Sequence, residues 1–297
     1  AVRAQVTQIG GRVLVRPLHG VGELASLSAA ADGVIVQSNA DESLVKVKLL
    51  KEREAVRRKI VVGGCDPAMF LAVKHVPKRD QENLVPFLMG SGSALEALKR
   101  GEVHVAGIHL AEESSGVWRL PNLKYSLGDM ECMVVTFAHW EEGFIVRHGN
   151  PKKIRSIADI ARPTVKIVNR EKGSGARRLL DKQLNSSAMN PDRIKGYDDE
   201  VLSHLDVASR IKSGLADTGI GIRAAAVMYG LDFTPLQRER YDLVIPKVYY
   251  ETLGCLKELL DTIMSKPFRG EVEALGGYDT RETGKIVESG DNHRPRQ

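Results

Sequence analysis

The stretch that decides the fold is Val165–Leu184, VKIVNREKGSGARRLLDKQL. Its opening residues, 165–168, are mainly apolar and predict a strand, whereas Gly173 and Gly175 predict a loop that leads into an amphipathic helix. The same succession of strand, Gly/Ser loop and helix is repeated in Ile60–Lys74, Leu84–Arg100 and Ala216–Tyr229. Strands that alternate with helices at this spacing predict parallel α/β sheets, in which ligands bind beyond the carboxyl ends of the strands.

Length and composition are those of an ordinary folded protein. The chain of 297 residues is long enough for about two domains, and 42% hydrophobic with 27% charged residues exclude wholesale disorder. The longest apolar runs, such as Ala224–Tyr229, fall far short of the ~18 residues of a membrane span. Lys and Arg number 43 against 38 acidic residues, which favours an anionic ligand without the clustered basic runs of a nucleic-acid binder. We therefore expect no membrane segment and no nucleic-acid partner.

The first fifty residues predict a small β module. Its strands are expected at Arg12–Arg16, Gly33–Gln37 and Ser43–Leu49. The following run Lys51–Lys59, KEREAVRRK, is mostly charged and predicts an exposed connector ahead of the apolar strand Ile60–Val62. We therefore divide the chain into a β domain at 1–56, a larger α/β domain at 57–290 and a flexible tail at 291–297.

The cysteines and histidines do not predict a cation site. Cys65, Cys132 and Cys255 are an odd number without a CxxC spacing, which argues against a disulfide framework and a structural zinc site. Neither a His-x-x-x-His nor a His-Glu-x-x-His spacing occurs, so we expect packed or surface histidines. The histidines considered are His104, His109, His139, His148 and His204. Because the N-terminus also lacks the pattern of an export signal, we expect a cytoplasmic location.

Two loops have the composition of an oxyanion site. Ser174 stands between two glycines at a predicted helix start, beside Lys172 and Arg177, and Gly90–Ser93 forms a similar uncharged loop. A helix start presents unpaired N–H groups and a partial positive charge, which attract an anion. An ordinary tight turn or N-cap remains the alternative for each loop. Neither loop matches a phosphate-binding P-loop, a dinucleotide fingerprint or a hydrolase nucleophile elbow, so no catalytic residues are assigned.

The expected oxyanion site draws on helix starts in both halves of the larger domain. A structural role remains the favoured alternative for Cys65. For Asp66 the favoured alternative is a helix cap, because a carboxylate would repel an oxyanion. The candidate ligand-binding residues are Cys65, Asp66, Ser91, Gly92, Ser93, Ser174, Gly175, Ala176, Arg177 and Thr218.

Five stretches, which follow one another along the chain in the order of a known family, carry a resemblance to that family. They are Gly101–Leu110 (GEVHVAGIHL), Val168–Arg177 (VNREKGSGAR), Ala216–Ala226 (ADTGIGIRAAA), Glu239–Pro246 (ERYDLVIP) and Ala274–Thr280 (ALGGYDT). From Ile60 to about Val287 the chain resembles the cytoplasmic, periplasmic-binding-protein-like domain associated with molybdate and tungstate, which has a LysR-substrate-domain-like fold. Such domains occur fused to molybdopterin biosynthesis proteins or to DNA-binding regulators.

The resemblance implies a two-lobed, type II venus-flytrap fold of α/β class. Lobe one is expected at 58–138 and 246–288, lobe two at 139–245, with two chain crossings as the hinge. The family has Thr where this chain has Ala176, so one hydroxyl donor is missing and Ala176→Thr is expected to tighten binding. Arg177, rather than Arg178, is expected to reach the anion.

Residues 1–50 are similar to the C-terminal β domain of molybdopterin molybdenumtransferase, through Val15–Leu18, Leu24–Leu27 and Ala31–Val36. The two resemblances together imply the C-terminal part of a fusion protein that binds molybdate or tungstate for molybdenum-cofactor biosynthesis. This part would bind the anion as ligand, without a cofactor and without catalysis of its own, and the expected partners are molybdopterin-synthesis proteins and a second copy of the chain. A regulator's sensing domain and a solute receptor of a molybdate or tungstate ABC transporter are the alternatives.

Overall fold

The computed structural model describes residues 2–9, 12–17, 33–38, 45–81, 83–110, 112–114, 117–119 and 123–287. The N-terminal part forms a four-stranded antiparallel sheet in the order β2-β1-β3-β4. Its strands are β1 Val2–Ile9, β2 Arg12–Pro17, β3 Gly33–Ser38 and β4 Val45–Leu49. Three of the four match predicted β segments. The compared stretch Leu24–Leu27 and the expected tail, 291–297, lie outside the described residues.

The expected connector at 51–59 contains a short helix; Glu52, Arg57 and Arg58 are exposed as expected, whereas two other residues are buried. Helix α2, Arg53–Arg57, occupies its centre, and Val56 and Lys59 are only 4% and 2% exposed. Counting charges misses this arrangement, because one apolar side chain per turn is enough to anchor a short charged helix.

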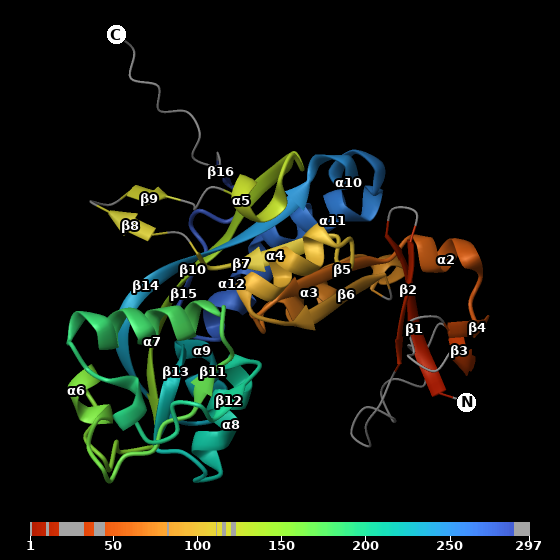
Figure 1. The fold of residues 1–297 in the computed structure, drawn as a ribbon. Coiled ribbons are helices and arrows are strands. Elements are labelled where there is room, and N and C mark those ends of the chain that lie inside the picture. The colour runs from red at the N-terminus through yellow and green to blue at the C-terminus, as the bar shows by residue number, and fades with distance from the viewer. Residues whose placement is uncertain are drawn as a thin grey trace.

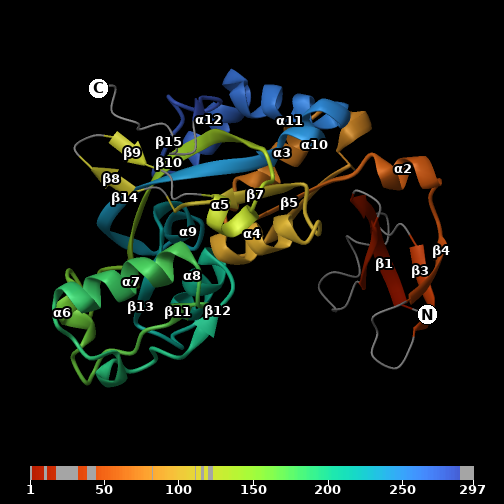
Figure 2. The ribbon, with the colours of Figure 1, turned by 45° about the horizontal axis from the view of Figure 1, so that its top comes forward.

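Lobe one is built around three parallel strands. Strands β5 Ile60–Gly64, β6 Leu84–Leu88 and β7 Val105–Ile108 run parallel, with β5 in the middle. Helices cover the sheet on both faces (Figures 1 and 2). They are α3 Met69–His75, α4 Ser91–Lys99, α5 Lys124–Leu127, α10 Lys247–Thr252, α11 Gly254–Met264 and α12 Lys266–Ala274.

Two long strands join the lobes. Strands β10 Cys132–Val146 and β14 Asp232–Pro246 pair antiparallel along their whole length. One end of this ribbon pairs with β7 in lobe one, and the other end pairs with β13, Thr218–Ile222, in lobe two. The large sheet is therefore mixed rather than purely parallel. Irregularities in the β10–β14 register after Thr136 and Glu142 bend the ribbon between the lobes.

Lobe two carries its helices around β13. Its longest helix is α7, which Ser174 caps by accepting a hydrogen bond from the Arg177 backbone N–H, 3.2 Å away. The expected strand at 165–168 shortens to one parallel bridge between Ile167 and Thr218, followed by β11. The elements are α6 Ile157–Ile160, β11 Asn169–Arg170, α7 Gly175–Ser186, β12 Glu200–Val201, α8 His204–Lys212 and α9 Arg223–Met228.

Smaller elements complete the described chain. They are 3-10 turns at Lys78–Asp80 and Pro191–Arg193, the hairpin β8 Glu112–Ser114 and β9 Val117–Arg119, and strands β15 Tyr278–Asp279 and β16 Ile286–Val287, which pair with β10. Within the described part, every helix is too short or too polar to span a bilayer.

Candidate functional site

The two Gly/Ser loops meet where the lobes face one another. The backbone N–H of Gly92, in the first turn of α4, donates to the carbonyl oxygen of Gly173, just before α7, at 3.3 Å. A Cβ atom added to Gly90 would lie 3.2 Å from Cβ of Ser174. Helix starts from separate lobes therefore converge, as the sequence predicts for an interlobe site.

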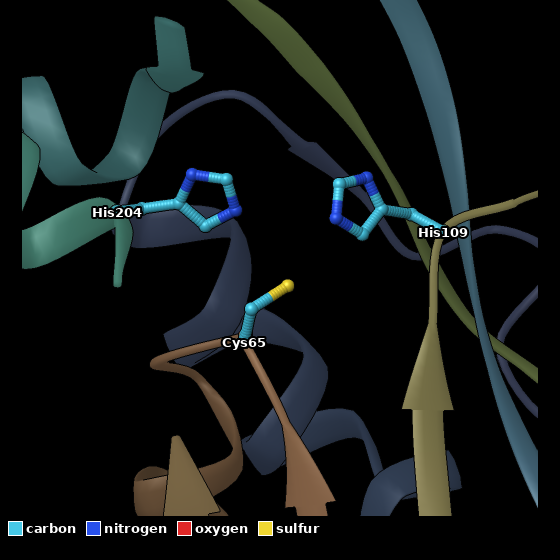
Figure 3. A group of neighbouring side chains, drawn as sticks. All are labelled: Cys65, His109 and His204. Atoms are coloured by element: carbon cyan, nitrogen blue, oxygen red, sulfur yellow. The ribbon is translucent and has the colours of Figure 1, made fainter. Parts of the chain in front are cut away.

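Three buried side chains gather beside these loops. Cys65 follows β5, His109 follows β7 and His204 is the first residue of α8. Each is at most 2% exposed, and Sγ of Cys65 lies with one ring nitrogen of each histidine so that all three atoms are within 4.8 Å of one another. Figure 3 shows these side chains, which come from three separate elements, directed toward a common point.

The fold explains why these side chains meet. Strands β5 and β7 are parallel neighbours, so Cys65 and His109 leave the sheet at the same edge. The Oγ of Ser91 accepts a hydrogen bond from the His109 backbone N–H at 3.1 Å, which ties this edge to α4. His204 enters from lobe two because Ser203 caps α8 by accepting from the Asp206 N–H at 3.0 Å.

Gly175 allows lobe two to approach this closely. A Cβ atom at this first residue of α7 would lie 2.2 Å from Cε1 of His109, far inside any real contact distance. Only a residue without a side chain lets α7 close over the imidazole ring.

Buried N–H groups without partners surround the three residues. Trp140, on β10, packs its ring edge-to-face against His109 and His204, with ring centroids 5.2 and 5.9 Å apart respectively. Among the described residues, nothing accepts a hydrogen bond from Nε1 of Trp140 or Nη1 of Arg170, and both imidazole rings also lack hydrogen-bond partners. Buried polar groups are seldom left unpaired, so this cluster has the composition of a ligand site.

Arg170 is the buried positive charge of the cluster. Its guanidinium is held by Glu171, which accepts from Nε at 2.7 Å and from Nη2 at 2.9 Å, and its side chain has no exposed surface. This pairing occupies one edge of the guanidinium, Nη2 also donates to the Leu202 carbonyl at 3.0 Å, and Nη1 is left for another acceptor. The positive charge acts on both histidines, which places it beside the cluster.

The histidines are neutral in this environment. Burial lowers the pKa of His109 to about 3, and the charges of Arg170 and Arg178 contribute. Burial also lowers the pKa of His204 well below its ordinary value, again with a contribution from Arg170. Each ring therefore carries one N–H donor and one nitrogen lone pair at neutral pH.

The pKa values of the thiol and of a nearby carboxyl group are raised, which favours their protonated forms. Burial raises the pKa of the Cys65 thiol. Burial, and then repulsion from Glu239, raise the pKa of Glu142, whose Oε2 lies 3.7 Å from Nδ1 of His109.

Comparison with known proteins assigns the family. The model of the PBP superfamily domain matches residues 75–263, more than half of the chain. The chain belongs to the PBP superfamily. The predicted two-lobed, periplasmic-binding-protein-like α/β fold is therefore confirmed.

Two sequence relatives and one solved structure are similar to this PBP superfamily protein. The uncharacterized protein YvgK of Bacillus subtilis (strain 168) is 36% identical over 232 residues, which cover 78% of this chain and 74% of that protein. An uncharacterized protein encoded in the 5′ region of a ferredoxin gene of Clostridium pasteurianum is 46% identical over 112 residues, 37% of this chain and 96% of its own. A putative phosphate ABC transporter substrate-binding protein of Clostridium perfringens, solved with bound phosphate, shares the fold. Its TM-score is 0.51 at 11% identity, covering 73% of this chain and 97% of its own.

Several of the predicted site residues have structural partners instead. Asp66 accepts hydrogen bonds from the Ala68 N–H at 2.8 Å and the Tyr278 hydroxyl at 2.6 Å, so it caps and braces the chain after β5. The Thr218 hydroxyl donates to the Ile145 carbonyl at 2.8 Å inside the lobe-two sheet. Ser93 is exposed on α4.

The side chain of Arg177 has partners within lobe two. Its Nε donates to Asp181 at 3.1 Å, its Nη1 donates to Glu200 at 2.9 Å, and its guanidinium lies 4.1 Å from the centre of the Tyr197 ring. These partners hold the buried side chain within lobe two, away from the Gly/Ser loops. Arg178 contributes to the lowered pKa of His109, so the greater role expected of Arg177 stays a prediction.

The structure also corrects the orientation expected of Ala176. Its side chain is 1% exposed and belongs to the apolar core of lobe two, with Leu179 and Leu180. The residue before it faces His109, but one step along a helix turns the next side chain by about 100°. The Ala176 methyl group therefore faces the core rather than the cleft.

Spacing rules missed the residues at the centre of the cluster. His109, His204 and Arg170 come from three different segments, and Trp140 and Glu142 come from a fourth, strand β10. A signal for two of them was present, because His109 follows an apolar strand and Arg170 directly precedes the Gly/Ser loop of α7.

Proposed function

We propose that this PBP superfamily domain binds a small tetrahedral oxyanion, molybdate or tungstate, between its two lobes. The observation that carries the proposal is the partnerless Nη1 of Arg170, on a guanidinium buried beside other partnerless N–H groups at the lobe interface. A charged donor left unsatisfied in the interior is costly, and an anion bound there would satisfy it.

The surrounding groups suit a tetrahedral acceptor. The Trp140 indole and one N–H from each neutral histidine add donors that make no hydrogen bond among the described residues, and an acceptor, Oε2 of Glu142, lies 3.7 Å from Nδ1 of His109. The starts of α4 and α7 bring partial positive charge from opposite lobes. An oxyanion presents several acceptor oxygens in different directions, so donors from both lobes can share one ion.

Support for a tetrahedral anion also comes from fold and sequence. The Clostridium perfringens protein of the same fold was solved with phosphate, which is itself a tetrahedral oxyanion. The choice of molybdate or tungstate rests on the sequence resemblance described above. On the same basis we propose that the domain serves molybdenum-cofactor biosynthesis in the cytoplasm, next to molybdopterin-synthesis proteins and in a homodimer, and that it performs no chemistry itself.

Calorimetry on the full chain tests the proposal. Molybdate, tungstate, sulfate and phosphate are titrated in turn, and one of the first two should bind with a stoichiometry of one and raise the melting temperature. If none of the four anions releases heat or shifts the melting temperature at millimolar concentration, the oxyanion proposal is wrong.

Trp140→Phe and Arg170→Gln probe the donors directly. Trp140→Phe keeps an aromatic ring and removes the N–H, whereas Arg170→Gln removes the charge. We expect affinity losses of about 1.5–3 kcal/mol for the charged donor and of about 1 kcal/mol for the indole. Arg162→Gln, at a partly exposed arginine on lobe two, is the matched control and should bind like the unsubstituted protein.

A further inference from the structure

We infer that Cys65, His109 and His204 form a binding site for one borderline-soft divalent cation of the Zn²⁺ type. The site lies at the interface of the lobes and is held by one sulfur and two imidazole nitrogens. It uses the Cys65 sulfur and one lone pair of each imidazole, whereas the proposed oxyanion would accept from N–H groups, two of them on the same rings, so the two proposals are tested separately.

The geometry of the three side chains is that of a ligand set. The sulfur and the two nitrogens lie within 4.8 Å of one another, and the residues are at most 2% exposed. Both nitrogens of each ring have no hydrogen-bond partner among the described residues, so a lone pair on each is available. Ordinary core histidines satisfy at least one ring nitrogen, whereas these two point at a common centre together with a thiol (Figure 3).

The donor set selects the class of cation. One thiolate and two imidazoles suit Zn²⁺ and its neighbours, whereas Mg²⁺ and Ca²⁺ prefer oxygen ligands. Three protein ligands leave a fourth tetrahedral position for water or another small ligand. On binding, the Cys65 S–H bond breaks, its proton leaves to solvent, and the electron pair on sulfur forms the bond to the metal, with no change of oxidation state.

The charges around the site favour a cation despite Arg170. The ion pair of that guanidinium with Glu171 reduces its repulsion of a cation. Two buried carboxyl groups, Glu142 and Glu239, reach within 4.8 Å of a His109 nitrogen and of each other. A dication bound to His109 therefore has acidic groups close by, which offsets the remaining repulsion from the arginine.

The cation would join the two lobes. Cys65 and His109 belong to lobe one, whereas His204 begins a helix of lobe two. Metal binding should therefore stabilise the closed arrangement in which Gly92 and Gly173 are hydrogen-bonded.

Cobalt is the spectroscopic probe for this site. The chelator-treated full chain is titrated with Co²⁺ under reducing conditions, and sulfur-to-cobalt charge-transfer absorption should saturate at one equivalent and disappear when Zn²⁺ is added. Cys65→Ser should abolish this absorption. His204→Gln should weaken Zn²⁺ binding by about 100-fold or more, since loss of even an outer-sphere partner typically costs 10- to 100-fold.

Cys132→Ser and Cys255→Ser are the matched controls and should leave the spectrum and the stoichiometry unchanged. Should a variant fail to fold, the unsubstituted protein gives a second test, because Zn²⁺ must protect Cys65 from a thiol reagent more than it protects the other two cysteines under denaturant-free conditions. Absorption that survives Cys65→Ser, or an unsubstituted protein that takes up no cobalt and shows no protection, overturns the inference.

The oxyanion proposal is tested apart from the cation. Tungstate is titrated into chelator-treated protein and into Cys65→Ser. Tungstate binding without cobalt binding leaves the oxyanion proposal standing and removes the cation site. Cobalt binding without tungstate binding does the reverse.

Discussion

At the residue scale, two neighbouring positions on α7 show how one helical step separates ligand contact from core packing. Gly175 lies against the His109 ring, whereas the Ala176 side chain belongs to the core cluster around Leu179 and Leu180. The family that the sequence resembles has Thr at this position, so the sequence alone predicts that a hydroxyl there would contact the ligand. The structure assigns the side chain at this position to packing.

Ala176→Thr is therefore expected to destabilise the protein without tightening anion binding. The larger side chain must enter a filled apolar core, and its hydroxyl has no evident acceptor there, so we expect a loss of about 1–3 kcal/mol in the free energy of unfolding. Denaturant unfolding measures this loss, and tungstate calorimetry should give an unchanged affinity. A several-fold gain in affinity with unchanged stability would show that the side chain at position 176 faces the cleft.

At the element scale, the sequence predicted what is local and missed what is assembled. Strands β5 and β6 and helix α7 lie where apolar runs and Gly/Ser loops place them, because hydrophobic periodicity and helix caps act over a few residues. The Cys65–His109–His204 cluster depends on parallel neighbouring strands and on a helix from the other lobe. The sequence missed the ion pair of Arg177 with Glu200 for a related reason. Glu200 lies on β12, a two-residue strand that no sequence pattern indicates.

Helix α6 gives a prediction at this scale, since a capping box starts it. Asp159 accepts hydrogen bonds from the backbone N–H groups of Arg155 and Ser156, both at 2.9 Å, and these bonds lower the pKa of its carboxyl. A lowered folded-state pKa stabilises the fold at pH values above the unfolded pKa, and this contribution is lost as the pH falls through the folded value. Asp159→Ala should therefore cost about 1 kcal/mol at pH 7.

Unfolding titrations at several pH values check the Asp159 prediction. The difference between Asp159→Ala and the unsubstituted protein should shrink below pH ~4, where an unfolded aspartate becomes protonated. A difference that stays constant down to pH 2 would show that the carboxylate does not act through its charge.

At the scale of the whole molecule, the two-stranded ribbon of β10 and β14 carries both lobes, and the site lies beside its middle. Trp140 and Glu142 stand on this ribbon next to a register irregularity, while the other site residues come from one lobe or the other. A ligand that satisfies groups from both lobes must therefore favour closure over opening about the ribbon.

Hydrogen exchange at two neighbouring amides measures that closure. The Gly92 N–H donates across the interface to Gly173, whereas the Ala94 N–H donates to Gly90 within α4. Opening of the lobes breaks the first bond and spares the second. We expect Gly92 to exchange at least ~10-fold more slowly when the site is saturated with tungstate or Zn²⁺, with Ala94 nearly unchanged. If both amides slow equally, the ligand stabilises α4 or the whole fold; if neither changes, binding does not close the lobes. Slower exchange at Gly92 alone follows only if the ligand joins the two lobes. The Gly92 hydrogen bond depends on contact between the lobes, whereas the hydrogen bonds within α4 do not.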